Sequence, residues 1–249
     1  LTDTDGSESL SLSIDGIPEG ATITSGTDSF TATSGSTAVD VTGWDLTSLQ
    51  ITPPADSDAD FTLNVTATST EADGGDTAST SQQLDITVTG VADTPTVTVN
   101  DAAGAEDTAI ALDVSGAVTD SGESLSLSIG DIPEGATLTS GTDSFTATSG
   151  STTADITGWD LANLTITPPA NSDVDFDLNV TATSSEDGTT ASSSGTMTVS
   201  VAADADAPTL TMGTTASGAE DTAIDLPDIT AGLTDTDGSE SLSLSIDGI

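Results

Sequence analysis

The sequence predicts an all-β chain built from tandem β-sandwich repeats, and three observations support this prediction. Apolar and polar residues alternate along short runs such as SLSLSI at 124–129, which is the pattern of a strand with one buried face. No segment carries a helical pattern of useful length. The stretch LTDTDGSESLSLSIDGI at 1–17 recurs unchanged at 233–249, and an edited form, VTDSGESLSLSIGDI, occupies 118–132.

The repeat period is close to 115 residues, because five landmark pairs share that spacing: Leu10 and Leu125, Phe30 and Phe145, Trp44 and Trp159, Pro53 and Pro168, Phe61 and Phe176. This period is too long for a solenoid and has the size of a whole domain. Proline, which is excluded from sheet interiors, marks joints near 93–95 and 204–208. We therefore predict a partial repeat lacking its first strand at 1–92, a complete repeat at 93–203 and the start of a third at 204–249.

The complete repeat contains seven predicted strands, separated by turn residues. They are 96–99 continuing past a kink to 109–114, 124–129, two strands between 136 and 157, 164–167, 176–183 and 195–201. Seven short strands with turns at this spacing are typical of an immunoglobulin-like Greek-key sandwich.

The composition is extreme, with 42 acidic residues, no Lys, Arg or His, and a net charge of −42. Two close carboxylates repel by about 1 kcal/mol in water and about 4 kcal/mol near a protein surface. The chain must therefore be disordered, live in high salt or fold around cations. The ordered alternation of its apolar residues, 34% of the chain, argues against disorder. Without basic residues it cannot bind nucleic-acid phosphates.

Several other classes of protein are also disfavoured. The chain has no Cys, so it has no disulfides, and no apolar window is long enough for membrane insertion in this fragment. No His, Lys, Cys or Tyr is present to act as a base or nucleophile. Carboxylate pairs that might hydrolyse glycosides lie in loops with few aromatic residues nearby. We predict that the protein is not an enzyme.

Acidic residues gather where strands are expected to end. If successive strands alternate in direction, the kink in the first strand, the turn after it, the loop near 173 and the exit from the last strand share one end of the domain. The carboxylates there are Glu106, Asp107, Asp120, Glu123, Asp173, Asp175, Asp204 and Asp206. Calcium takes six to eight oxygen ligands, and Asp and Glu are suitable hard donors. We predict a calcium cluster at each joint.

Matching groups occur in the other two repeats. They are Asp3, Asp5, Glu8, Asp58, Asp60 and Asp93 in the first, and Glu220, Asp221, Asp235, Asp237 and Glu240 in the third. The alternative is that all these carboxylates are simply solvated on an acidic surface. Glu186 and Asp187, at the opposite end of the domain, either complete a site or form an ordinary turn. DTDGSE is not an EF-hand loop, because the D-x-D-x-D-G order and the distant Glu are missing.

The ordered motifs GAEDTAI, LTDTDGSESLSLSI, IPEGATL, LTITPP, DVDFDLNVTAT and a D-x-P linker resemble the cadherin-like extender repeats of large bacterial RTX adhesins, over the whole chain. The resemblance implies a secreted, calcium-binding cell-surface protein that is exported by type I secretion and serves cell adhesion and biofilm formation. In that family, calcium at the joints stiffens the array. Glu106, the acidic loop near Asp173 and the linker Asp204 also resemble the layout of cadherin calcium sites.

These observations together predict calcium-stiffened extender repeats, whose partners are neighbouring identical repeats and which project a distal adhesive domain. The alternative is a module that itself mediates adhesion or like-with-like association. In particular, the partial repeats at the two ends of this chain are candidates for end-to-end self-association. A second alternative is an acidic disordered stalk.

Overall fold

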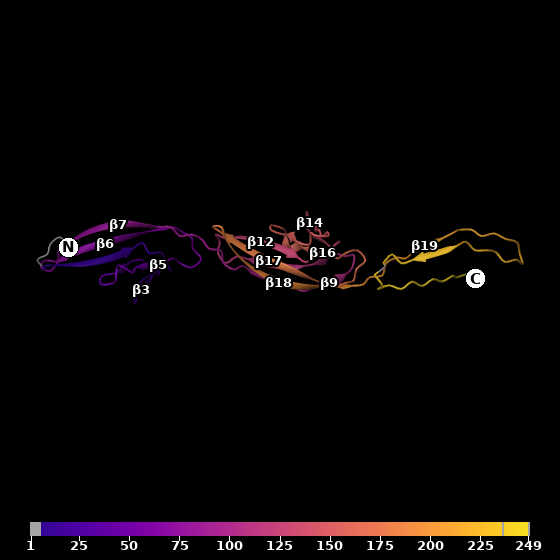
Figure 1. The fold of residues 1–249 in the computed structure, drawn as a ribbon, viewed down its shortest axis with the longest axis horizontal. Coiled ribbons are helices and arrows are strands. Elements are labelled where there is room, and N and C mark those ends of the chain that lie inside the picture. Colours follow the sequence, from indigo (N-terminus) through magenta and orange to yellow (C-terminus); the bar gives the residue numbers. More distant parts are fainter. Residues whose placement is uncertain (1–5, 236, 249) are drawn as a thin grey trace. The chain divides into compact units, whose positions relative to one another are not determined.

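The computed structural model describes residues 6–235 and 237–248, and their regular structure is almost entirely β-strand (Figure 1). One 3-10 turn, η1 (Leu161–Asn163), is the helical element within these ranges. The predicted all-β class is confirmed. The described residues include no helix of the length and apolarity that crossing a membrane requires.

The strand bounds follow the predicted repeats. Residues 6–92 contain β1 (Glu8–Asp15), β2 (Thr22–Ser25), β3 (Asp28–Thr31), β4 (Val39–Asp40), β5 (Gln50–Thr52), β6 (Phe61–Glu71) and β7 (Thr77–Ile86). Residues 93–203 contain β8 (Thr96–Asn100), β9 (Ala102–Ala105), β10 (Ile110–Ala111), β11 (Asp113–Ala117), β12 (Ser124–Gly130), β13 (Thr137–Ser140), β14 (Asp143–Thr146), β15 (Ala154–Asp155), β16 (Thr165–Thr167), β17 (Phe176–Glu186) and β18 (Thr189–Ala202). The third repeat contains β19 (Thr209–Met212) and β20 (Ile229–Gly232).

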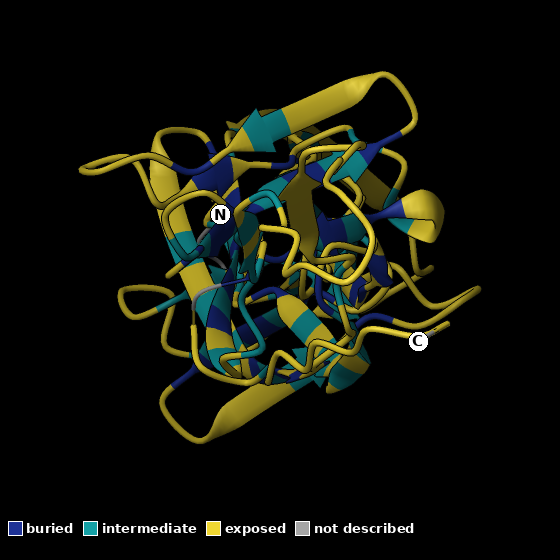
Figure 2. Ribbon diagram, turned by 90° about the vertical axis from the view of Figure 1, so that its right-hand side faces the viewer, coloured by how far each residue is buried: buried dark blue, intermediate teal, exposed yellow. Residues whose placement is uncertain are grey.

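The middle repeat is a sandwich of two main sheets. One has the strand order β15-β12-β17-β18-β9 and the other β10-β16-β13-β14, with β8 and β11 forming a separate pair. Apolar side chains from both sheets, among them Ile129, Leu138, Ile166 and Val180, are fully buried in one core. Single strands in Figure 2 carry bands of buried, intermediate and exposed residues, as alternation requires.

The first repeat reproduces this pattern in two sheets, β4-β1-β6-β7 and β3-β2-β5, around a smaller core that includes Ile14, Ile17 and Ile23. Turn hydrogen bonds recur at the 115-residue spacing. The N–H of Val41 donates to the carbonyl of Leu12 at 2.9 Å, and the N–H of Ile156 donates to that of Leu127, also at 2.9 Å. The internal repetition of the sequence is therefore a repetition of structure.

The structure corrects one predicted strand. Residues 96–114 do not form a single kinked strand, because β8 and β11 pair antiparallel, with Thr96 opposite Ala117 and Val99 opposite Val114. The chain reverses between β9 and β10, and β9 lies parallel to β18 in one sheet while β10 pairs with β16 in the other. An odd number of reversals has been added, so the turn at 118–123 lies at the end of the repeat opposite to the one expected.

The remaining predicted strands agree with the observed ones at their centres. The expected strands 124–129 and 164–167 correspond to β12 and β16, while β17 and β18 are longer than predicted. By proximity the chain divides into two compact units. Unit 1 comprises Leu1–Asp93, Val118–Ser124 and Ser185–Ala191, and unit 2 comprises Thr94–Ala117, Leu125–Ser184 and Ser192–Ile249. The three-repeat frame itself stays a prediction.

Truncating the fully buried Leu138 to alanine is expected to destabilise the middle repeat by about 2–5 kcal/mol, because it removes core contacts and leaves a cavity. Urea unfolding in a Trp44→Phe background checks this, since Trp159 packs against the same core and its fluorescence reports on that repeat. Thr142→Ala, in an exposed turn, is the control and should stay within about 0.5 kcal/mol of wild type. A loss below about 1 kcal/mol for Leu138→Ala would contradict a close-packed core.

Candidate metal centres

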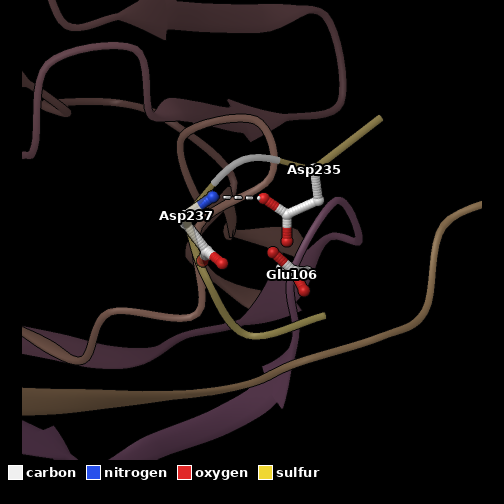
Figure 3. A group of neighbouring side chains, drawn as sticks. All are labelled: Glu106, Asp235 and Asp237. Atoms are coloured by element: carbon white, nitrogen blue, oxygen red, sulfur yellow. Dashed lines mark hydrogen bonds between the residues drawn. The ribbon is translucent and has the colours of Figure 1, made fainter. Parts of the chain in front are cut away.

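Unit 2 contains a cluster of three carboxylates that face one another, from Glu106, Asp235 and Asp237 (Figure 3). One oxygen of each lies within 4.8 Å of the others. Glu106 directly follows β9, whereas both aspartates belong to the turn after β20. The cluster therefore joins segments of the second and third predicted repeats, and it is called site 2 below together with the adjoining Asp173, Asp204, Asp206 and Glu240.

The local sequence GAEDT sets the position of Glu106. Gly104 lets Ile110 fold back against it, because a Cβ at Gly104 would lie 2.6 Å from the Cγ1 of Ile110. Asp107 adopts a left-handed conformation with φ 55°, and the hydroxyl of Thr108 donates to the carbonyl of Ala105 at 2.8 Å. This tight reversal places Glu106 at the end of the sandwich.

Glu106 and Asp235 are almost completely buried, with 2% and 1% of their surface exposed. The N–H of Asp204 donates to Oε1 of Glu106 at 2.9 Å, but Oε2 of Glu106 is buried and has no hydrogen-bond partner among the described residues. Asp235 accepts hydrogen bonds from the N–H of Asp237 at 2.8 Å and from the hydroxyl of Ser239 at 3.0 Å. Two acidic groups are thus buried together in a chain that contains no basic side chain.

Glu240 extends site 2 toward the linker. The N–H of Asp206 donates to Oε1 of Glu240, and Oε2 of Glu240 is a second buried oxygen for which the described residues offer no partner. Asp204, Asp206 and Glu240 together line a hollow of about 450 Å³. An unsatisfied buried carboxylate oxygen costs free energy unless a ligand supplies the missing interaction.

Electrostatics at site 2 favour proton or cation uptake. The N–H of Asp204 lowers the pKa of Glu106, but burial and the charges of Asp235, Asp237 and Asp107 outweigh that hydrogen bond, so the pKa is raised. Burial and then the charge of Asp237 raise the pKa of Asp173, whereas hydrogen bonds from Ser239 lower the pKa of Asp237. Asp173 therefore holds a proton that it donates to Asp237.

Unit 1 contains a related group of carboxylates, called site 1, which consists of Asp58, Asp93, Asp120, Glu123 and Glu186. Asp58, Asp93, Asp120 and Glu186 line a hollow of about 340 Å³. Glu186, at the end of β17, is 9% exposed, and its Oε1 is buried without a hydrogen-bond partner among the described residues. Site 1 therefore shares with site 2 a buried carboxylate oxygen that lacks a donor.

Two glycines of site 1 make room for Glu186. A Cβ at Gly90 would lie 2.3 Å from Cδ of Glu186, and one at Gly122 would lie 2.7 Å from its Oε1. The N–H of Asp93 donates to Oε1 of Glu123, in the same way that Asp206 donates to Glu240 in site 2. The linker and the turn that follows β11 or β20 are therefore joined by the same bond at both joints.

Site 1 also disfavours its own negative charge. Burial first, and then the charges of Asp120, Asp58, Asp187 and Glu123, raise the pKa of Glu186. Burial likewise raises the pKa of Asp93, and the neighbouring charges of Asp56, Glu123 and Asp120 add to that effect.

The structure divides the predicted ligands between the two sites. The expectation that Asp120 and Glu123 meet Glu106 at one end of the domain is wrong, because the reversal between β9 and β10 sends the turn at 118–123 back to the linker before β8. Asp120 and Glu123 lie in site 1. Their counterparts Asp235 and Glu240, from the next repeat, lie beside Glu106.

Other predicted ligands lie elsewhere or fix loops. Asp175 and Asp60 accept hydrogen bonds from the N–H groups of Val201 and Val88, at 2.7 and 2.8 Å. Asp107 accepts one from the N–H of Asn171 at 3.1 Å. The counterparts in the outer repeats are not clustered: Glu220 and Asp221 are exposed, and Glu8 lies in β1 opposite Glu71. Asp3 and Asp5 lie outside the described residues.

The sequence reasoning did not select Glu186, Asp187 or Asp56 as ligands. Asp187 accepts a hydrogen bond from the N–H of Gly90 at 3.0 Å, and Asp56 lies beside Asp93. One signal was available for Glu186. It ends a strand in which Leu178, Val180, Ala182 and Ser184 alternate inward, so strand periodicity already points its side chain to the buried face.

Both sites offer only oxygen donors, from carboxylates, hydroxyls and backbone carbonyls, and such donors favour hard divalent cations. The buried oxygens of Glu106, Glu186 and Glu240 without partners fit a positively charged ligand, which no side chain of this sequence can replace.

No protein-family model matches the chain, and a search of curated proteins finds no significant match. Among solved structures, it is similar to Drosophila N-cadherin EC1-4, at 17% identity and a TM-score of 0.30, covering 78% of this chain and 41% of that one. It is also similar to Drosophila N-cadherin EC1-3, at 15% identity and a TM-score of 0.25, covering 81% and 57%. This chain thus spans about half the length of these solved chains. Overlaps this weak carry no argument about function, which has to come from the sites themselves.

Proposed function

We propose that sites 1 and 2 bind calcium and that calcium locks neighbouring repeats together. The observation that carries the proposal is Glu106, a fully buried carboxylate whose Oε2 has no hydrogen-bond partner in the described part of the chain and which faces Asp235 and Asp237. Three negative charges at this spacing, without a basic residue, repel strongly in a low-dielectric setting. A divalent cation reverses the sign of that interaction.

The residues that would hold the ions are those with buried or convergent oxygens. In site 2 they are Glu106, Asp173, Asp204, Asp206, Asp235, Asp237 and Glu240, and in site 1 they are Asp58, Asp93, Asp120, Glu123 and Glu186. Carboxylates that bridge two ions suit calcium, which accepts irregular sets of six to eight oxygens, better than magnesium, which demands a near-octahedral set and keeps several waters.

Each site draws ligands from two predicted repeats and from the linker between them, so an ion bound there would restrict the linker. The expected result is a stiff spacer. This supports an assignment as extender repeats of a bacterial cell-surface adhesin that project a distal adhesive domain away from the cell. The resemblance of the GAEDTAI, IPEGATL and LTITPP motifs to RTX adhesin repeats supports the same assignment.

Thermal unfolding in millimolar calcium, in excess chelator and in magnesium tests the proposal. Free calcium at 100 times its dissociation constant stabilises a one-site protein by about 2.7 kcal/mol. Because each kcal/mol raises the melting temperature of a unit this size by about 2–4 °C, we expect a rise of roughly 5–10 °C for a single site and more for several. Magnesium should give much less. Equal melting temperatures in calcium and chelator would show that the carboxylates are merely solvated.

A further inference from the structure

An apolar groove of about 250 Å³ opens in the first repeat, between the sheets β4-β1-β6-β7 and β3-β2-β5. Its lining comes from both sheets and includes Leu12, Ile51 and Leu84. Leu84, on β7, is 52% exposed, and Leu46 at the rim is 48% exposed. The groove therefore leaves part of a sandwich interior in contact with water, which is unfavourable in proportion to its apolar area.

The middle repeat shows what covers the same surface when the sandwich is complete. The counterparts of Leu12, Ile51 and Leu84 are Leu127, Ile166 and Met197, which are 6%, 0% and 0% exposed. They are covered by the β8–β11 hairpin, whose Ile110, Leu112 and Val114 are buried in the same core. Ile110 pairs with Ile166, and the N–H of Leu112 donates to the carbonyl of Leu164 at 3.0 Å.

The third repeat contains the same hairpin, at 209–232, with its apolar side chains exposed. Thr209 lies opposite Gly232 and Met212 opposite Ile229, in the register that Thr96, Ala117, Val99 and Val114 adopt in the middle repeat. The fold-back also recurs, since a Cβ at Gly218 would lie 2.6 Å from Cγ1 of Ile224, as at Gly104 and Ile110. The large apolar side chains of this segment, Leu210, Met212, Ile224 and Leu226, are 58%, 52%, 45% and 66% exposed.

We propose that residues 209–232 of a second copy of this chain fill the groove of the first repeat, so that copies assemble head to tail. By analogy with the middle repeat, Ile224 of one copy would pair with Ile51 of the next, and Leu226 would cover the sheet that carries Leu84. The argument for a second copy is register, because the hairpin already has the conformation that fills this place in the same fold. The two surfaces differ, so the contact is heterologous and leads to open chains or rings.

The mass of residues 1–249 in solution, measured in calcium at moderate salt over a wide range of concentration, tests the proposal. Wild type should exceed the monomer mass of 24.4 kDa increasingly as concentration rises. Leu226→Asp in the hairpin and Leu84→Asp in the groove should each return the protein to the monomer. Both side chains are mainly exposed, so neither change should unfold its own repeat. A mixture of the two variants should stop at a dimer, because only one hairpin and one groove remain. Thr142→Asp adds the same charge in an exposed turn and should assemble like wild type.

A self-complemented chain provides a second control. Residues 233–249 repeat residues 1–17, so placing a copy of residues 207–232 directly before Leu1 restores the sequence order found in the third repeat. The added hairpin should fill the groove from within the chain and abolish assembly. A constant mass of 24.4 kDa for wild type at every concentration would overturn the proposal. Assembly that persists in the fusion or in the two aspartate variants would overturn it equally.

Discussion

Glu106→Gln is expected to weaken calcium binding at site 2 about tenfold or more and to remove most of the calcium-induced rise in melting temperature of unit 2. The substitution keeps the shape and the hydrogen bond from Asp204 but removes the buried negative charge beside Asp235 and Asp237. Calcium affinity depends strongly on ligand charge, so the loss falls on binding. In chelator the effect should reverse: the variant should melt above wild type, because burial and like charges disfavour an ionised Glu106.

Glu134→Gln is the matched control, because it makes the same chemical change at an exposed turn outside both sites. Titration calorimetry and melting of wild type and both variants, with and without calcium, give the comparison. The control should leave all four quantities unchanged. If Glu106→Gln bound calcium as tightly as wild type, Glu106 would not be a ligand, and the orphaned oxygen would need another explanation.

The sandwich was predictable because its information is local. The alternation in 124–129 and 176–183 identifies strands whose buried faces carry Leu127 and Val180, and the 115-residue period carries that result from one repeat to the next. Alternation does not reveal direction, however. The runs on either side of GAED look like one interrupted strand, and the reversal there depends on the pairing of β8 with β11, a tertiary contact.

The composition of the sites was therefore easier to predict than their partition. Acidic turns at Asp173, Asp204 and Asp235 are evident in the sequence, since nothing in it can neutralise them. Which turns meet depends on the number of chain reversals between them, so one missed reversal moved Asp120 and Glu123 from site 1 to the wrong end of the repeat. Glu186 was missed because a glutamate ending a polar strand is usually solvated, and its burial depends on the neighbouring Gly90 and Gly122.

Acidification is expected to change stability in opposite directions with and without calcium. In the calcium-free protein, Glu106, Asp173, Glu186 and Asp93 have pKa values raised above the ordinary 4.5 for Glu and 3.8 for Asp. The folded state therefore takes up protons while the unfolded chain is still ionised, so stability rises as pH falls from 7 through these raised values. The gain is complete near the ordinary values.

Aspartates with lowered pKa values oppose this trend only at lower pH. Hydrogen bonds from Thr42, Thr47 and Thr157 lower the pKa of Asp40, Asp45 and Asp155, so their stabilisation is present above 3.8 and is lost only below about pH 4. The interval between pH 7 and about pH 5 is therefore governed by the two sites. With calcium bound, protons compete with the ion for the same carboxylates, and stability should fall across that interval.

Melting temperatures at several pH values between 7 and 5, in saturating calcium and after exhaustive dialysis against calcium-free buffer, measure the effect. Dialysis is preferable to a chelator, which loses affinity for calcium as pH falls. The two curves should converge toward acidic pH, the calcium-free one rising and the calcium-loaded one falling. The variant Glu106→Gln should show a smaller rise without calcium, because one of the responsible groups can no longer take up a proton. Curves that run parallel would mean that calcium does not bind through the carboxylates whose pKa values are raised, and sites 1 and 2 would lose their assignment as metal centres.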